Sequence, residues 1–130
     1  MPAYEEAARA FIACAHTGSP DDFWVHEGIL LLNVEQRYDE LWEFVLAVLD
    51  LTPFDDTDAL ALIAAGPLED IVRYAASAFE ERIVERIKAD PKFRRAMTGV
   101  WAREERKDFW CRITPLFYEY PTESIDGYRK

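Results

Sequence analysis

Two neighbouring carboxylates follow a glycine and a proline in the stretch IAAGPLEDI, residues 63–71. A pair of carboxylates can share general acid and general base roles, or bind a cation. The same stretch is also typical of a corner between two helices. Gly66 can end one helix in a left-handed conformation, and Pro67 suits the first position of the next. Glu69 and Asp70 would then face the positive end of the helix dipole. We therefore interpret these four residues as a structural corner.

The histidine at position 26 is the second candidate for chemistry. Glu27 follows it, and Asp22 precedes it by four residues. Imidazole and carboxylate groups bind metal ions, but this spacing spreads the three side chains around a helix instead of placing them on one face. We therefore predict no metal site and interpret Asp22 and His26 as a side-chain pair. The alternative is a small enzyme whose site combines His26 and Glu27 with Glu69, Asp70 and nearby arginines.

Other motifs for catalysis or cofactor binding are missing from the sequence. The acidic run DDTD at 55–58 lacks the glycine and the glutamate that a calcium loop needs at its sixth and twelfth positions. It suits the start of a helix better. The sequence contains no Gly-x-Ser-x-Gly motif and no glycine-rich phosphate loop. We expect no cofactor, and the sequence favours a protein that is not an enzyme.

Apolar residues recur with helical period in every long segment of the chain. Gly18 predicts the end of a helix that begins at residue 2, and Ser19 predicts the start of the next. Asp55, Asp56 or Thr57 is expected to cap a helix that runs to Gly66. The region after Pro67 divides into one helix over 67–79 and another over 79–90. Two more helices are expected within 90–101 and 106–120.

This pattern predicts an all-α fold of about eight short helices in stacked antiparallel pairs, compact or slightly solenoidal. Residues 1–118 are expected to form a single domain, and residues 119–130 a loose tail. The predicted core follows the apolar stripe of each segment. It contains Phe11, Leu31, Leu41, Trp42, Val45, Leu49, Leu62, Ile63, Ile71, Phe79, Ile83, Phe93 and Trp101.

Two motifs in fixed order resemble an uncharacterised bacterial domain family of unknown function. They are the Ala-Ala-Gly-Pro-Leu-Glu-Asp turn at 64–70 and the Asp-Pro-x-Phe-Arg-Arg-Ala helix start at 90–96. The resemblance extends over roughly residues 21–112. It implies an all-helical fold, and it carries over no activity and no catalytic residue.

The charge of the chain is distributed unevenly. The formal net charge is −10, whereas residues 1–58 alone hold 13 acidic residues against only Arg9 and Arg37. Such an acidic balance argues against binding to nucleic acid as a function, because attraction to phosphates supplies most non-specific affinity. The segment 91–112 is basic and carries interleaved aromatic residues. It has three interpretations: a single-strand binding face, a solvated face over core aromatics, or a segment that docks on the acidic part of this chain or of a second copy.

The sequence therefore favours a non-enzymatic protein-interaction domain, of the inhibitor or immunity type, that binds a basic partner. A self-associating structural module, such as a homodimer, is the alternative. The expected contact residues are Asp21, Asp22, Glu35, Asp39, Glu40 and Glu43, with Trp24 and Tyr38 as aromatic anchors.

The cysteines and the apolar runs bear on localisation. Cys14 and Cys111 stand in no metal-binding or redox spacing, so we expect buried, reduced thiols. No segment resembles a signal peptide, and no apolar run approaches the length of about 20 residues that a membrane span requires. We therefore expect a cytoplasmic protein without a membrane contact.

Overall fold

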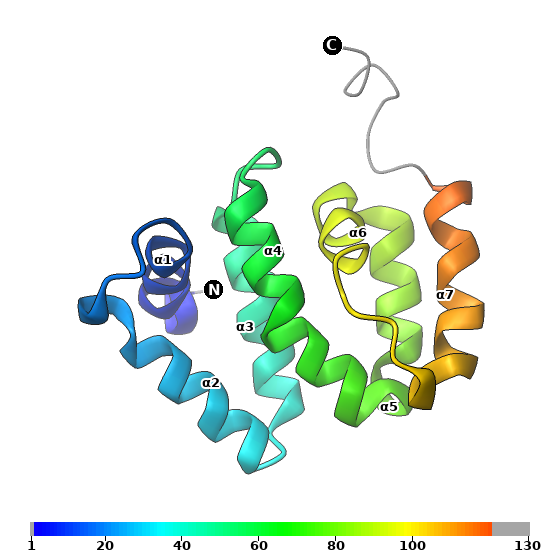
Figure 1. The fold of residues 1–130 in the computed structure, drawn as a ribbon, viewed down its shortest axis with the longest axis horizontal. Helices are drawn as coiled ribbons and strands as arrows, with labels where there is room; N and C mark the ends of the chain where they lie inside the picture. Colours follow the sequence, from blue (N-terminus) through cyan, green and yellow to red (C-terminus); the bar gives the residue numbers. More distant parts are fainter. Residues whose placement is uncertain (1, 121–130) are drawn as a thin grey trace.

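The described part of the computed structural model, residues 2–120, consists of α-helices and two short 3-10 helices (Figure 1). The order is α1 (Pro2–Thr17), η1 (Pro20–Asp22), α2 (Trp24–Val34), α3 (Tyr38–Leu51), α4 (Thr57–Ala65), α5 (Pro67–Ala89), α6 (Pro91–Met97), η2 (Glu104–Arg106) and α7 (Lys107–Glu119). The all-α prediction is confirmed for these residues. The expected loose tail lies mostly in 121–130, outside the described residues, while α7 itself extends to Glu119.

Local capping explains where several helices begin and end. Gly18 follows α1 with a φ of 64°, a conformation that glycine adopts without steric cost. Ser19 accepts a hydrogen bond from the backbone N–H of Asp21 through its hydroxyl. The Asp56 carboxylate accepts from the N–H of Ala59 at 3.1 Å and caps α4. Asp90 caps α6 in the same way, before Pro91. These four boundaries agree with those expected from the sequence.

The predicted boundary between residues 67–79 and 79–90 is wrong, and this is one reason why fewer helices form than the eight expected. One helix, α5, covers the whole range, but it bends at Ala75, whose φ of −138° and ψ of 24° are not helical. The two halves of α5 therefore run in different directions (Figure 1). No proline or glycine marks this position, so the sequence gives no local signal for the bend.

The core lies around α3, which is buried along most of its length. Leu41, Val45 and Val48 have no exposed surface, and α1, α2 and α5 pack around them. Ten of the thirteen predicted core residues are buried, and Leu62 is partly buried.

The prediction is wrong for Leu31 and Trp101, which are 51% and 64% exposed. Leu31 is exposed because α2 buries only its Val25 and Ile29 side. Trp101 follows α6 in a connection, where the guanidinium of Arg103 covers its ring.

The C-terminal helices do not follow the expected antiparallel stacking throughout. The connection after α6 crosses back along the molecule before α7 begins, so α7 runs parallel to the second half of α5 (Figure 1). These two helices pack against each other.

The cysteines and the helix lengths are also visible in the structure. Cys14 is buried as expected, but Cys111 is exposed because it lies on the solvent side of α7, and both thiols are free. Within residues 2–120, no helix combines the length and apolar character that crossing a bilayer requires.

Candidate functional site

The predicted corner joins α4 directly to α5, with Gly66 as the residue between them. Gly66 has a φ of −117°, so the expected left-handed conformation is wrong. The corner needs no such turn because α5 begins immediately, with the Asp70 N–H donating to the Gly66 carbonyl. Instead, a Cβ at this position would lie 3.1 Å from the carbonyl oxygen of Leu62.

The carboxylates of the corner have different environments. Glu69 accepts a hydrogen bond at 3.0 Å from Arg103, and both side chains are mostly buried. Among the described residues, Arg82 and Arg86 instead pair with Asp39 and Asp90. The arginine that pairs with this corner is therefore Arg103.

Asp70 is half-buried, and burial raises its pKa above the ordinary value. The neighbouring charge of Glu69 raises this pKa further, while Arg73 lowers it. Burial also raises the pKa of Tyr38, and the charge of Asp70 adds to that effect. This effect agrees with the packing of α3 against α5.

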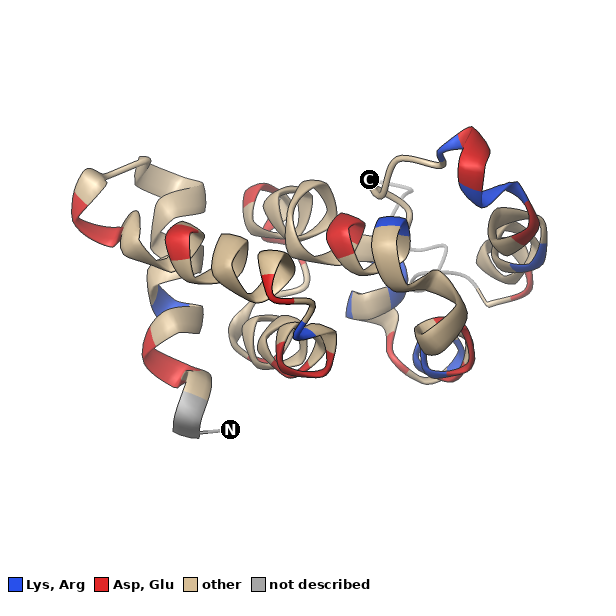
Figure 2. Ribbon diagram, turned by 90° about the horizontal axis from the view of Figure 1, so that it is seen from below, with Lys and Arg blue, Asp and Glu red and all other residues tan. Residues whose placement is uncertain are grey.

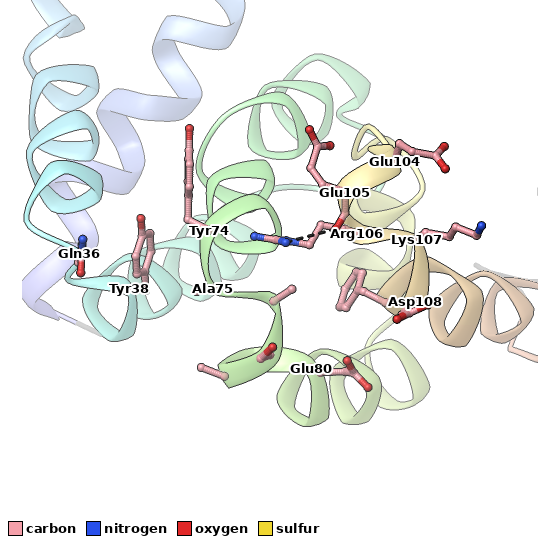
Figure 3. Close-up of a pocket in the computed structure, with 14 residues that line it drawn as sticks. Gln36, Tyr38, Tyr74, Ala75, Glu80, Glu104, Glu105, Arg106, Lys107 and Asp108 are labelled. Atoms are coloured by element: carbon pink, nitrogen blue, oxygen red, sulfur yellow. Dashed lines mark hydrogen bonds between the residues drawn. The ribbon is translucent and has the colours of Figure 1, made fainter.

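A cleft of about 730 Å³ opens where α5 bends (Figure 3). Tyr38 and Tyr74 stand on one side, and charged residues of η2 and the start of α7 stand on the other. Arg106 points between these sides and donates to the carbonyls of Val72 and Arg73. In a straight helix those carbonyls would accept from residues four positions later. The arginine therefore caps the first half of α5 from a distant part of the chain.

The described residues of this cleft do not form a recognisable catalytic set. Their lining has no histidine and no cysteine, and their acidic and basic side chains are mixed. Because its central guanidinium is held by main-chain carbonyls, Arg106 is a structural residue rather than a free anion-binding group. No three described His, Cys, Asp or Glu residues are grouped as a metal site.

The histidine of the alternative enzyme hypothesis lies elsewhere. The ring of His26 packs against Phe11 at 5.6 Å and Phe23 at 5.1 Å, measured between ring centroids. Glu69 and Asp70, by contrast, belong to the corner with Arg103 and Tyr38. The structure provides no contact that joins the two groups among the described residues.

The basic segment 91–112 makes most of its polar contacts within the chain. Lys92 donates to the carbonyls of Leu49 and Thr52 at the end of α3. Arg94 is buried and donates to the carbonyl of Ile87. Arg112 pairs with Glu80 and Glu81 on α5. Of these three residues, only Lys92 reaches the acidic first 58 residues, and it binds main-chain carbonyls there rather than carboxylates.

The N-terminal half keeps its negative charge on the surface. Acidic residues dominate α1 to α4, whereas the charged residues of α6 are all basic and those of η2 and α7 are mixed (Figure 2). Some acidic side chains do have internal partners. Arg37 pairs with Glu35 and Glu40, Arg82 pairs with Asp39, and His16 pairs with Asp56. Most other acidic residues of this half have no such pair within residues 4–120.

The expected contact residues do not form one continuous patch. Asp21 and Asp22 lie in η1, just before α2, and Trp24 is the first residue of α2. Glu35 follows the other end of this helix. Eleven residues of helix separate the two groups by about 16 Å. Tyr38 is not a free anchor, because its hydroxyl donates to Asn33 at 2.7 Å and its ring lines the cleft at the bend. Asp39, Glu40 and Glu43 lie in the first turns of α3.

The surface that sequence reasoning missed is the apolar exposed side of α2. Nine large hydrophobic residues are exposed among those described, and five of them lie at or on this helix. They are Phe23, Trp24, Leu30, Leu31 and Val34. We call this set the α2 apolar face. Clustered exposed apolar side chains often mark interaction surfaces, and no described element of the chain covers these five. The apolar run Gly-Ile-Leu-Leu-Leu at 28–32 is the sequence signal for this face, but such a run occurs equally well in a buried helix.

An apolar groove of about 240 Å³ adjoins this face. It lies between α1, α2 and α3, and its lining includes Tyr4, Trp24, Gly28, Leu31 and Phe44. Burial raises the pKa of Tyr4, the charges of Glu40 and Glu43 raise it further, and that of Arg37 lowers it. Glu43 and the ion pair of Glu40 with Arg37 therefore stand close to the apolar groove.

Comparisons with known proteins add a family but no activity. Residues 14–119 match the family model DUF6869, described as a family of unknown function. No curated protein and no solved structure matches the chain.

Proposed function

The chain belongs to the DUF6869 family, and we propose, from its surface, that it is a non-enzymatic interaction domain that binds a basic surface of another protein. The observation that carries the proposal is the juxtaposition of the α2 apolar face with unneutralised acidic residues. Several cations of the second half, among them Lys92, Arg106 and Arg112, bind carbonyls or carboxylates of the same chain. They therefore leave most of the N-terminal charge in place.

The two features have different roles in binding. Apolar side chains at the centre of an interface supply most of the affinity once water is excluded, and Trp24 is the aromatic residue best placed for this. The surrounding charges, such as Glu27 and Glu43, steer a basic partner and raise the rate of association.

Self-association of α2 is a weaker candidate. A homodimer through this face would bring together two halves that each carry a net charge of −11 over residues 1–58. Like charges at a short distance oppose such a contact. A basic partner relieves this repulsion, whereas nucleic acid would increase it.

The particular role that we propose is that of an inhibitor or immunity-type protein. A small acidic domain that associates rapidly with a basic enzyme suits this role, because protection depends on fast association. We propose the cytoplasm as its compartment, since the exposed thiol of Cys111 persists best in a reducing environment.

Site-specific photo-crosslinking tests the proposal in the native host. A photoreactive phenylalanine replaces Leu31, which is 51% exposed on α2 and lines the apolar groove, and a control replaces Tyr118, which is 83% exposed on α7. We expect a protein with a basic surface to be crosslinked from position 31 and not from position 118. Crosslinks from position 31 only to a second copy of this chain would support self-association and contradict the proposal.

Charge reversal then tests the interface with the purified crosslinked protein. We expect Glu27→Lys with Glu43→Lys to slow association by about tenfold or more. The control, Glu85→Lys with Glu104→Lys, changes the net charge equally at exposed positions of the other half. Binding should also weaken between about 0.1 M and about 1 M salt, where the Debye length falls from about 10 Å to about 3 Å. Equal rates for both variants, or no salt dependence, would refute the acidic face as the contact.

A further inference from the structure

A glycine in the interior of α2 has no structural reason within the part of the chain that the structure describes. Gly28 lies in the second turn of the helix, where glycine lowers helix stability relative to alanine. Its backbone does not have a positive φ, unlike that of Gly18. A Cβ at position 28 would meet no described atom within 4 Å. Neither backbone conformation nor crowding within residues 2–120 therefore requires glycine here.

The position of this glycine suggests the reason. Gly28 lines the apolar groove between Trp24 and Leu31, which lie one turn before and one turn after it. Tyr4 and Phe44 contribute from the opposite helices. The missing side chain leaves the helix backbone open in the middle of an apolar lining. Small residues at such positions let a second backbone approach closely.

We propose that this groove seats an amphipathic helix of the basic partner, and that the partner helix comes closest to α2 at Gly28. This inference rests on the proposed function and specifies what the partner presents. Helices bind such grooves through apolar residues spaced at i, i+3 or i+4, and i+7. The length of α2, about 16 Å, matches about three turns of such a helix. Lysine and arginine beside its apolar stripe would face Glu27 and Glu43, since Glu40 already pairs with Arg37.

Two other occupants fit the groove less well. A second copy of this chain would bring its own acidic residues against Glu40 and Glu43. An extended peptide usually gains affinity by adding to the exposed edge of a sheet, whereas helices alone surround this groove. A helix with basic flanks satisfies both the apolar lining and the surrounding charge.

Designed peptides test the inference without knowledge of the natural partner. The probe is a peptide of about 18 leucine and lysine residues, with leucine at the helical spacing given above. A scrambled peptide has the same composition and charge but no apolar stripe. We expect the amphipathic peptide to bind at least about tenfold more tightly, as measured by isothermal titration calorimetry.

Substitutions at position 28 identify the groove as the place of binding. Gly28→Leu fills the groove and should remove the difference between the two peptides, while the melting temperature stays at or above that of the wild type. Ala61→Leu adds a similar bulk at an exposed position of α4 and should leave the difference intact. If Gly28→Leu fails to fold, Gly28→Ala provides the smaller change, with an expected partial loss of binding and a higher melting temperature.

Fluorine NMR of 5-fluorotryptophan provides an internal control. The resonance of Trp24, in the groove, should shift when the amphipathic peptide binds, whereas that of exposed Trp101 should not. Equal affinity for both peptides, unchanged binding by Gly28→Leu, or no binding at all would overturn the helix-in-groove inference. The crosslinking and charge-reversal results judge the basic-partner proposal separately, so either one can fail alone.

Discussion

Replacing Arg106 by alanine should destabilise the fold far more than replacing an arginine of an exposed ion pair. Its guanidinium donates to the carbonyl of Val72 at 3.3 Å and to that of Arg73, both at the bend of α5. A hydrogen bond from a charged donor is worth about 1.5–3 kcal/mol, and these two are only partly buried. We therefore expect a loss of about 2–3 kcal/mol, because the alanine removes both hydrogen bonds to the carbonyls at the bend. The melting temperature should fall by about 6–12 °C.

Urea denaturation followed by circular dichroism measures this loss, and Arg112→Ala is the matched control. Arg112 lies in the same region and pairs with Glu80 and Glu81 on the same helix, but its side chain is 43% exposed. Exposed pairs contribute about 0–1 kcal/mol, and salt should weaken this one further. Arg106→Lys should retain part of the stability, since lysine can reach a single carbonyl. A loss below about 0.5 kcal/mol for Arg106→Ala, or equal losses for the two alanine variants, would refute the capping role.

Three further changes test the energetics of the fold. Burial raises the pKa of Asp70, so the folded state binds more protons than the unfolded state. The contribution of Asp70 to stability therefore declines as the pH rises from its pKa in the unfolded state through its pKa in the folded state. Asp70→Asn should therefore stabilise the protein at pH 7 and lose that advantage under acid conditions; a destabilised variant at pH 7 would contradict this. Lys92→Met removes two hydrogen bonds to the end of α3 and should cost about 1–2 kcal/mol in chemical denaturation, whereas an unchanged midpoint would count against the cap. Gly66→Val should cost about 1 kcal/mol or more in thermal unfolding, because its Cβ would crowd the carbonyl of Leu62; Gly66→Ala should cost less, and equal stability of all three proteins would dismiss this crowding.

The features that the sequence predicts well depend on neighbours along the chain. Ser19, Asp56 and Asp90 cap helices through backbone groups two or three residues away. Such contacts form almost regardless of the rest of the fold. The burial of α3 was equally predictable, because apolar residues lie on most sides of this helix and such helices are stable only inside a core.

The features that the sequence does not predict depend on distant residues. Arg106 reaches a bend more than 30 residues away, and nothing in its neighbourhood indicates that it binds carbonyls there. Glu69 finds Arg103 over a similar separation. The bend at Ala75 has no helix-breaking residue, so tertiary contacts must impose it.

The candidate site was predictable in its charge but not in its shape. The excess of acidic residues in the first 58 positions is a property of composition alone. Whether Leu31 faces the core or water depends on which side of α2 the other helices cover. The expected contact residues lie apart for the same reason, since Trp24 lines the apolar groove and Tyr38 lines the cleft at the bend of α5.

The attachment of α7 has a consequence for local unfolding. This helix packs on α5 and η2, and its buried side chains are Phe109, Trp110 and Ile113. It can therefore open together with η2 while α1, α3 and α4 keep their mutual contacts. Native-state hydrogen exchange should show amides of α7 exchanging through a sub-global opening of lower free energy than those of α3. When α7 opens, Arg106 leaves the bend as well, so the two halves of α5 are expected to gain protection from exchange only when α7 is in place.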